Sequence, residues 1–213
     1  MVDSDSHTFP LPTLSDFLPP EQQRRFVHIS TADGLSHGMV LRIVQDDLGF
    51  MWFGTADGLN RYDGHTFKVY KNDPDDPGSI SSDSIWALYV DRSGTLWVGT
   101  EGGGLNRFDR DADRFIHYLP DPDDPYSLSD DGVTVIYEDR SGVLWIGTAT
   151  GGLNRFDRKT ERFTHYRHDP DDPYSISSDG IISILEDREG VLLYSETTCL
   201  DMVFVALYQY ILR

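Results

Sequence analysis

A stretch of about 14 residues occurs three times in this chain of 213 residues, and it limits the possible folds more than any other feature. The copies begin at Met51, Leu96 and Leu144 and read MWFGTADGLNRYD, LWVGTEGGGLNRFD and LWIGTATGGLNRFD. Their tryptophans are 45 and 48 residues apart. A fixed period of this length indicates a repeat protein, in which each unit buries its apolar faces only against its neighbours.

Each repeat contains four short segments that have the composition of β-strands. The first is an apolar run that ends in Asp-x-x-Gly, as in IWALYVDRSG at residues 85–94. Asp at the first turn position accepts hydrogen bonds from the turn backbone, and Gly at the fourth adopts positive φ without steric cost. The tryptophan segment, an LNR segment and an RFxHY or FKVY segment follow, each after a further turn. The pattern predicts a four-stranded antiparallel meander in each repeat.

A connector with the core Asp-Pro-Asp-Asp-Pro follows each of the three meanders. Because proline cannot donate to a β-ladder, the connector must leave the sheet before the next repeat begins. Four-stranded meanders joined from outer to inner strand, with a period near 45 residues, are the blades of a β-propeller. We therefore predict an all-β fold, an incomplete β-propeller at residues 25–192 after a disordered leader at residues 1–24. Its blades are expected at about residues 39–71, 84–119 and 132–167, with a partial blade at 180–192.

The two ends of the array depart from the repeat. RFVHI at residues 25–29 matches the last strands of two later repeats, RFIHY and RFTHY, so an outer strand is expected before the first complete blade. In the fourth repeat Leu193, Ser195 and Glu196 replace Trp, Gly and Thr, and residues 193–213 are interpreted as a divergent apolar tail. Three blades and part of a fourth do not close a ring, and open strand edges favour association. We expect head-to-tail self-association with a second copy.

The composition limits the partners of the chain. Its 36 acidic residues exceed its 18 Lys and Arg residues, and the net charge of −18 repels phosphate backbones and anionic membranes. We expect no nucleic-acid partner and no membrane contact, since no apolar run approaches the roughly 20 residues of a membrane span. The single Cys199 excludes an intramolecular disulfide. The N-terminus has no basic and apolar signal-peptide pattern, which places the chain in the cytoplasm if Met1 is the true start.

Two motifs suggest chemistry but lack the context that the chemistry needs. GLSHG at residues 34–38 fits the pattern of a hydrolase nucleophile, but Ser36 lies in a connector followed by a strand, where the motif requires a helix. Asp73 and Asp75 fall at the first and third positions of a calcium-loop pattern, which Pro77 and Ser84 then break. A polar loop and a solvated Pro-Asp turn with a serine cap are the interpretations that we favour. We expect no catalytic residue, no metal and no cofactor.

Several residue types recur once in each repeat. The tryptophans and the glycines that follow them are expected to pack between adjacent sheets. A histidine recurs in the RFxH segment without a second ligand nearby, so we interpret it as a packing or edge residue: His28, His117 and His165. An arginine recurs in the LNR segment and is expected to pair with the aspartate two residues later on the same strand face. These arginines are the candidates for a ring of ligand-binding residues: Arg61, Arg107 and Arg155.

The combined pattern D-x-x-G-x-[LM]-W-[FVI]-G-T-x-x-G-L-N-R-[YF]-D, with DPDDPxS[IL]S between copies, resembles the two-component regulator propeller repeat of bacterial sensor proteins. The resemblance covers about residues 25–192. It implies a non-catalytic role in sensing an extracytoplasmic ligand, such as a glycan or another small molecule, next to a histidine kinase in the parent protein. No kinase activity is expected here, since the chain has neither a phosphoacceptor histidine motif nor an ATP-binding glycine motif. A protein-interaction scaffold and a fragment of a propeller lyase or glycosidase are the alternatives.

Overall fold

The structure is a computed structural model that describes residues 27–197 and the backbone of residues 205–208. The expected leader at residues 1–24 lies outside the described residues. Within them the fold is all-β apart from one short 3-10 helix, η3 (Thr31–Asp33). No helix in this part of the chain is long and apolar enough to cross a membrane.

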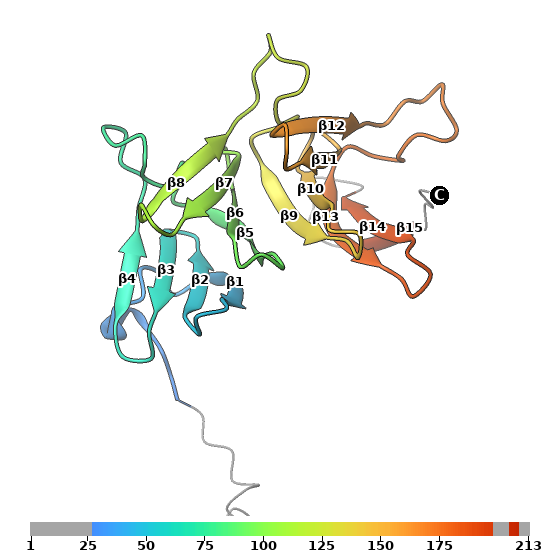
Figure 1. The fold of residues 1–213 in the computed structure, drawn as a ribbon. Coiled ribbons are helices and arrows are strands. Elements are labelled where there is room, and N and C mark those ends of the chain that lie inside the picture. Colours follow the sequence, from blue (N-terminus) through green and yellow to red (C-terminus); the bar gives the residue numbers. More distant parts are fainter. Residues whose placement is uncertain (1–26, 198–204, 209–213) are drawn as a thin grey trace, which may run out of the picture.

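Four antiparallel sheets follow one another along the chain (Figure 1). The first sheet contains β1 (Val40–Gln45), β2 (Met51–Thr55), β3 (Gly58–Tyr62) and β4 (Phe67–Tyr70). The second contains β5 (Ile85–Val90), β6 (Leu96–Thr100), β7 (Leu105–Asp109) and β8 (Arg114–Tyr118). The third contains β9 (Val133–Glu138), β10 (Leu144–Thr148), β11 (Leu153–Asp157) and β12 (Arg162–Tyr166). The fourth contains β13 (Ile181–Glu186), β14 (Leu192–Thr197) and β15 (Val205–Tyr208).

The sheets are arranged as the blades of an open propeller. Strand order within each sheet is sequential, and the first strands β1, β5, β9 and β13 contact one another in turn. They form the inner side of an arc, and β4, β8 and β12 lie at its periphery (Figure 1). The predicted incomplete propeller with four-stranded meanders is confirmed.

One aspartate organises the first turn of each complete blade. In the second blade Oδ1 of Asp91 accepts the backbone N–H groups of Ser93 and Thr95, at 2.9 and 3.0 Å. Its Oδ2 accepts the indole N–H of Trp97 at 2.8 Å. Asp46 and Asp139 hold their own turns and tryptophans in the same way. The aspartate therefore closes the hairpin, as predicted, and also fixes the orientation of the tryptophan.

The core lies between the blades, where the tryptophans were predicted to pack. Trp97 is 1% exposed and meets Phe156 of the next blade edge-on, with ring centroids 5.4 Å apart. Gly99, two residues further on, faces the inner strand of the next blade so closely that a Cβ there would stand 2.5 Å from Val133. The indole fills the space between two sheets and the glycine lets them approach.

The Asp-Pro-Asp-Asp-Pro connectors are self-contained turns, as expected. Asp73 accepts the backbone N–H of Asp75 through Oδ1, at 3.0 Å, and its own N–H donates to Oγ of Ser79 at 2.9 Å. The other two connectors repeat these bonds with Ser127 and Ser175. The serine is the cap that the sequence predicted.

The structure differs from the predicted boundaries at both ends of the array. Residues 27–30 form no strand, whereas an outer strand was expected at residues 25–29. The fourth sheet continues past residue 192 into β14 and β15, so the expected divergent tail begins as part of the blade. Loss of the tryptophan does not end the sheet, because pairing of β13 with β14 depends on backbone bonds and on the turn at Asp187, which accepts the N–H groups of Glu189 and Val191.

Candidate functional site

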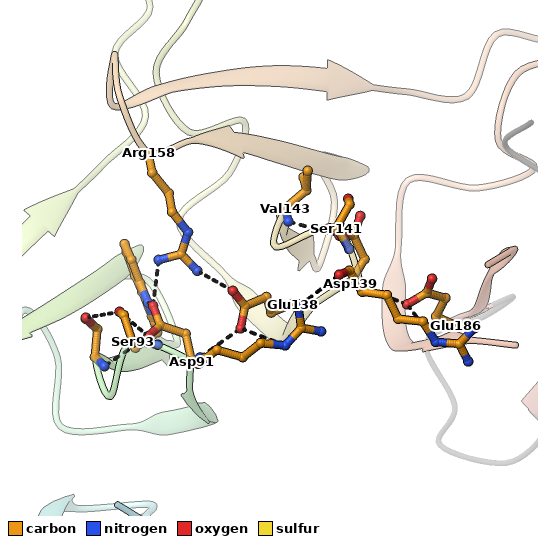
Figure 2. Close-up of polar contacts among 12 residues, drawn as sticks. Asp91, Ser93, Glu138, Asp139, Ser141, Val143, Arg158 and Glu186 are labelled. Carbon is orange, nitrogen blue, oxygen red and sulfur yellow. Dashed lines mark hydrogen bonds and ion pairs between the residues drawn. The ribbon is translucent and has the colours of Figure 1, made fainter. Parts of the chain in front are cut away.

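Arginines and carboxylates join neighbouring blades on the face that carries the first and third turns (Figure 2). Arg158 lies in the turn after β11 and reaches back to the second blade. Its Nη1 donates to Oδ2 of Asp91 at 2.6 Å, and its Nη2 donates to Oε1 of Glu138 at 3.2 Å. The side chains of Asp91 and Glu138 are 0% and 6% exposed, so these charges are held inside the protein. We call this arginine the interblade clamp.

The clamp recurs one blade earlier with different partners. Arg110 follows β7 as Arg158 follows β11, and its Nη2 lies 2.8 Å from Asp47 and 3.6 Å from Asp46. Gly64 stands at the equivalent place in the first blade, which has no preceding blade among the described residues. Each clamp therefore ties the aspartate that holds a tryptophan to the blade that follows it.

A second set of bonds connects the first turns of adjacent blades. The N–H of Arg92 donates to Glu138 at 2.9 Å, and the guanidinium of Arg92 donates to the carbonyl of Arg140 at 3.0 Å. Arg140 repeats both bonds with Glu186 and the carbonyl of Arg188, at 2.8 and 2.9 Å.

The set is absent between the first two blades because its residues are different there. Asp47 stands where the later turns have arginine, and Val90 stands where β9 and β13 end in glutamate. Asp47 pairs with the clamp residue Arg110 instead. Among the described residues, the first interface therefore has the clamp alone, the second has both kinds of contact, and the third has the second set alone.

The buried carboxylates are saturated with donors. Burial raises the pKa of Asp91, but hydrogen bonds from Ser93, Trp97, Arg158 and Thr95 outweigh it and hold that pKa below its usual value. The pKa of Asp139 is lowered in the same way, because bonds from Ser141, Trp145 and Val143 outweigh its burial. A carboxylate in this state is a poor proton acceptor, so these residues serve as electrostatic anchors.

The candidate arginines of the LNR segments have partners other than the predicted ones. Arg107 pairs with Glu161 of the next blade at 3.2 Å, and Arg61 lies 4.0 Å from Asp113 of the next blade. The expected partner two residues later is engaged in its own turn, since Asp109 accepts backbone N–H groups of the third turn. Arg155 is exposed. The predicted pairing within one blade is therefore wrong for Arg61 and Arg107, which connect blades. In the third blade the backbone N–H groups of Lys159 and Thr160 lower the pKa of Asp157, and the charge of Arg155 adds a smaller contribution of the same sign.

Asp113 and Glu161 are residues that the sequence analysis missed. Each also accepts the hydroxyl of a tyrosine from the preceding blade, Tyr70 at 2.8 Å and Tyr118 at 3.0 Å. Both adopt positive φ, at 52° and 53°, just before the outer strand. A signal existed, because an acidic residue precedes RF in the second and third repeats alone.

The other candidates have structural partners. Ser36 is bonded to Asn60 and Thr55, at 2.7 and 3.0 Å, and Ser81 and Ser129 hold equivalent asparagines in the later blades. The rings of His117 and His165 contact connector carbonyls at 2.7 Å, as edge residues do, and His28 is exposed outside any strand. Within the described residues, no group of three or more His, Cys, Asp or Glu side chains could hold a metal.

A polar groove of about 410 Å³ lies on the same face between the first two blades. Charged and hydroxyl residues make up most of its lining, which also includes Phe108 and Ile116. Of the three candidate arginines it contains Arg107. A groove lined mainly by hydrogen-bonding groups is suited to a polar organic ligand.

Three segments of the chain match the family described as Two component regulator propeller: residues 34–57, 79–102 and 127–150. Each matched segment runs from the end of a connector through the inner strand and the tryptophan strand into the second turn. A curated protein of Formosa agariphila named Histidine kinase P4 is 54% identical over 56 residues, which are 26% of this chain and 4% of that protein.

Solved structures with the same arrangement of blades include two extracellular domains from B. thetaiotaomicron. One, described as part of a hybrid two component system, has a TM-score of 0.73 and 30% identity over 80% of this chain and 24% of its own. The other, described as part of a one component system, has a TM-score of 0.61 and 29% identity over 73% of this chain and 22% of its own. The chain thus spans about a quarter of the length of these domains.

Proposed function

Because its three repeats belong to the two component regulator propeller family, we propose that the chain is a ligand-binding part of the extracytoplasmic sensor region of a bacterial two-component signalling protein. The observation that carries the proposal is the structural likeness, at a TM-score of 0.73 and 30% identity, to an extracellular domain described as belonging to a hybrid two component system. The chain covers a small part of such domains, so its role is that of a segment of a larger receptor.

The arrangement of charges supports binding rather than catalysis. The buried carboxylates of Asp91 and Asp139 already accept several hydrogen bonds and have a lowered pKa. Proton transfer to a substrate requires a carboxyl group with a raised pKa, and proton removal from a substrate requires a carboxylate with a free lone pair. A lyase or glycosidase built on these residues would need to break the bonds that hold the blades together.

The groove beside Arg107 is the place that we assign to the ligand. Its lining includes Arg107, Asp109 and Asp111. Charged donors and acceptors of this kind match the hydroxyl groups of a sugar. We therefore propose an oligosaccharide as the ligand class, which agrees with the resemblance noted from the sequence.

The test is a thermal-shift screen of the full chain against neutral and acidic oligosaccharides, followed by calorimetry on any ligand that raises the melting temperature. Arg107→Met should weaken ligand binding at least tenfold, because it removes a charged hydrogen-bond donor from the lining of the groove. The ligand should then raise the melting temperature of this variant less than that of the unmodified chain. Arg155→Met is the matched control, since it changes the equivalent arginine outside the groove. Equal ligand shifts in both variants would exclude the groove, cleavage of the oligosaccharides would favour the lyase alternative, and no binding in the millimolar range would favour a scaffold.

A further inference from the structure

The same aromatic contact joins the blades at the first interface, between the first and second blades, and at the second interface, between the second and third. Trp52 meets Phe108 edge-on with ring centroids 5.2 Å apart, and Trp97 meets Phe156 at 5.4 Å. A Cβ on Gly54 would stand 2.6 Å from the inner strand of the second blade, so the backbones approach as closely at the first interface as at the second. The apolar cores therefore do not distinguish the two interfaces.

The ion pairs around the core do distinguish the two interfaces. At the second interface the clamp Arg158 binds Asp91 and Glu138, whose side chains are 0% and 6% exposed. At the first interface the clamp Arg110 makes its short contact, at 2.8 Å, with Asp47, whose side chain is 55% exposed. An exposed ion pair contributes little to stability, because water and salt screen it and both side chains must be ordered. The polar contacts therefore hold the first interface less firmly than the second.

Other equivalent contacts are also longer or absent at the first interface. The guanidinium of Arg110 lies 3.6 Å from Oδ2 of Asp46, whereas the equivalent distance at the second interface is 2.6 Å. Arg61 lies 4.0 Å from Asp113, whereas the equivalent pair of the second interface is 3.2 Å apart. Lys68 adds a contact to Asp113, but these two side chains are 45% and 43% exposed. Among the described residues, the bonds between first turns join the second and third interfaces and not the first.

Two grooves lie along the first interface. The groove of about 410 Å³ has Asp47 of the first blade and Arg110 of the second blade in its lining. A second groove, of about 520 Å³, lies further out and is lined by β4, by the connector that follows it and by Asp113 and Phe115 of the second blade. Open space on both sides of the aromatic core lets the first blade tilt on the second without separating their rings.

We propose that the first interface is an adjustable joint and that the ligand of the 410 Å³ groove closes it. The inference rests on the proposed function, because it gives that groove a conformational role. A ligand that contacts Asp47 on one blade and Arg110 on the other binds the closed joint more tightly than the open one, and a ligand shifts an equilibrium by this difference in affinity. The second and third blades move as one body, since buried ion pairs and the bonds between first turns join them. Binding therefore changes the tilt of the first blade relative to the rest of the chain.

Hydrogen exchange of the full chain, followed by mass spectrometry, tests the joint without a ligand. Amides of β2 and β3 should exchange at least tenfold faster than those of β6 and β7, because opening of the joint releases the first blade as a unit. Asp47→Arg with Val90→Glu introduces the residue types that connect the first turns at the second interface, and should slow exchange in the first blade at least tenfold. Arg92→Asp with Glu138→Val is the matched reverse change. It should extend the fast exchange to the second blade, because the joint then opens at the second interface.

Simple fraying of a blade at the end of the array leads to a different result. In that case the first blade exchanges rapidly whatever ion pairs it makes, and Asp47→Arg with Val90→Glu leaves its exchange rate unchanged. That outcome would overturn the joint. Equal exchange rates in β2 and β6 of the unmodified chain would overturn it as well.

The closing of the joint is tested by repeating the exchange measurement with tetrasaccharides of glucose, xylose, mannose and galacturonic acid. A tetrasaccharide that raises the melting temperature should slow exchange in β2 and β3 at least tenfold, because it binds the closed joint. A tetrasaccharide that binds without slowing this exchange would overturn the closing role and leave the proposed function intact. If none of the four binds, the proposed function and the closing role fail together, and the paired variants alone decide whether the joint exists.

Discussion

Nη1 of Arg158 lies 2.6 Å from Oδ2 of Asp91, the atom that also accepts the indole N–H of Trp97. The arginine comes from the third blade, and the aspartate and tryptophan come from the second. The guanidinium of Arg158 thus binds the same carboxylate that orients Trp97 in the core of the neighbouring blade. Interblade packing and the turn of each hairpin are therefore coupled through one carboxylate.

Arg158→Met should destabilise the protein by about 1–3 kcal/mol, because it leaves the carboxylate of Asp91 buried with one fewer donor. Methionine keeps most of the aliphatic stem, so the loss reports on the charge and its hydrogen bonds. Urea unfolding followed by tryptophan fluorescence measures the difference. Arg155→Met changes an exposed arginine of the same blade and should stay within about 0.5 kcal/mol. Equal midpoints for the two variants would show that the clamp does not stabilise the array.

Trp97→Ala should cost about 3–5 kcal/mol, the range for deletion of a buried aromatic side chain. Trp97→Phe keeps a ring against Phe156 and removes the indole N–H that Asp91 accepts. It should cost less, about 1–3 kcal/mol, since the loss is mainly one buried hydrogen bond and a little volume. The melting temperatures of the three proteins at one concentration give the order. A tryptophan that can be removed without a change in melting temperature would contradict the packing described above.

The parts of the fold that depend on neighbouring residues could be predicted from the sequence. The first turn from Asp91 to Gly94 is encoded by the residues at its two ends, and the β-branched runs before it have strand length. Tryptophan and glycine recur at the same positions of the second strand in each repeat. Residues that recur in this way are expected to pack between adjacent sheets. The turns and strands depend on neighbouring residues, and the tryptophan and glycine positions recur in each repeat. A single sequence is therefore enough to predict them.

The partners of the arginines could not be predicted, because they lie far away in the sequence. Arg158 and Asp91 are 67 residues apart, and Arg107 pairs with Glu161 although Asp109 is closer along the strand. A strand places residues two apart on one face, but Asp109 is already used by its turn. The nearest free carboxylate then belongs to the next blade. Each arginine pairs with the carboxylate that is nearest across the blades. Which carboxylate is nearest depends on how the blades pack and not on the spacing of residues in the sequence.

The stability of the folded chain should decrease as the pH is lowered and Asp139 becomes protonated. Burial raises its pKa, but hydrogen bonds from Ser141, Trp145 and Val143 outweigh it, so the folded-state pKa lies below the unfolded value of about 3.9. A lowered pKa contributes stability that is complete above the unfolded pKa and is lost as the pH falls through the folded one. Asp139→Asn should therefore be less stable than the unmodified chain at pH 7, and the gap should shrink toward pH 3. A gap that is constant over this range would show that the charge of Asp139 is not the cause.

Gly99→Ala tests whether close approach of the blades is what the glycine provides. The new Cβ would stand 2.5 Å from Val133 and 2.9 Å from Ala87, so the third blade must move or the strand must bend, at about 1–3 kcal/mol. Gly38→Ala is the matched control, because no atom lies within 4 Å of its Cβ position and its φ is not in the left-handed region. Both substitutions reduce the entropy of the unfolded chain equally, by an amount that alone stabilises by about 0.4–1 kcal/mol. The control should therefore be neutral or slightly stabilised while Gly99→Ala is destabilised, when both are unfolded in urea at matched protein concentration. If the two variants unfold at the same midpoint, the blades have room for a methyl group and the glycine is retained for another reason.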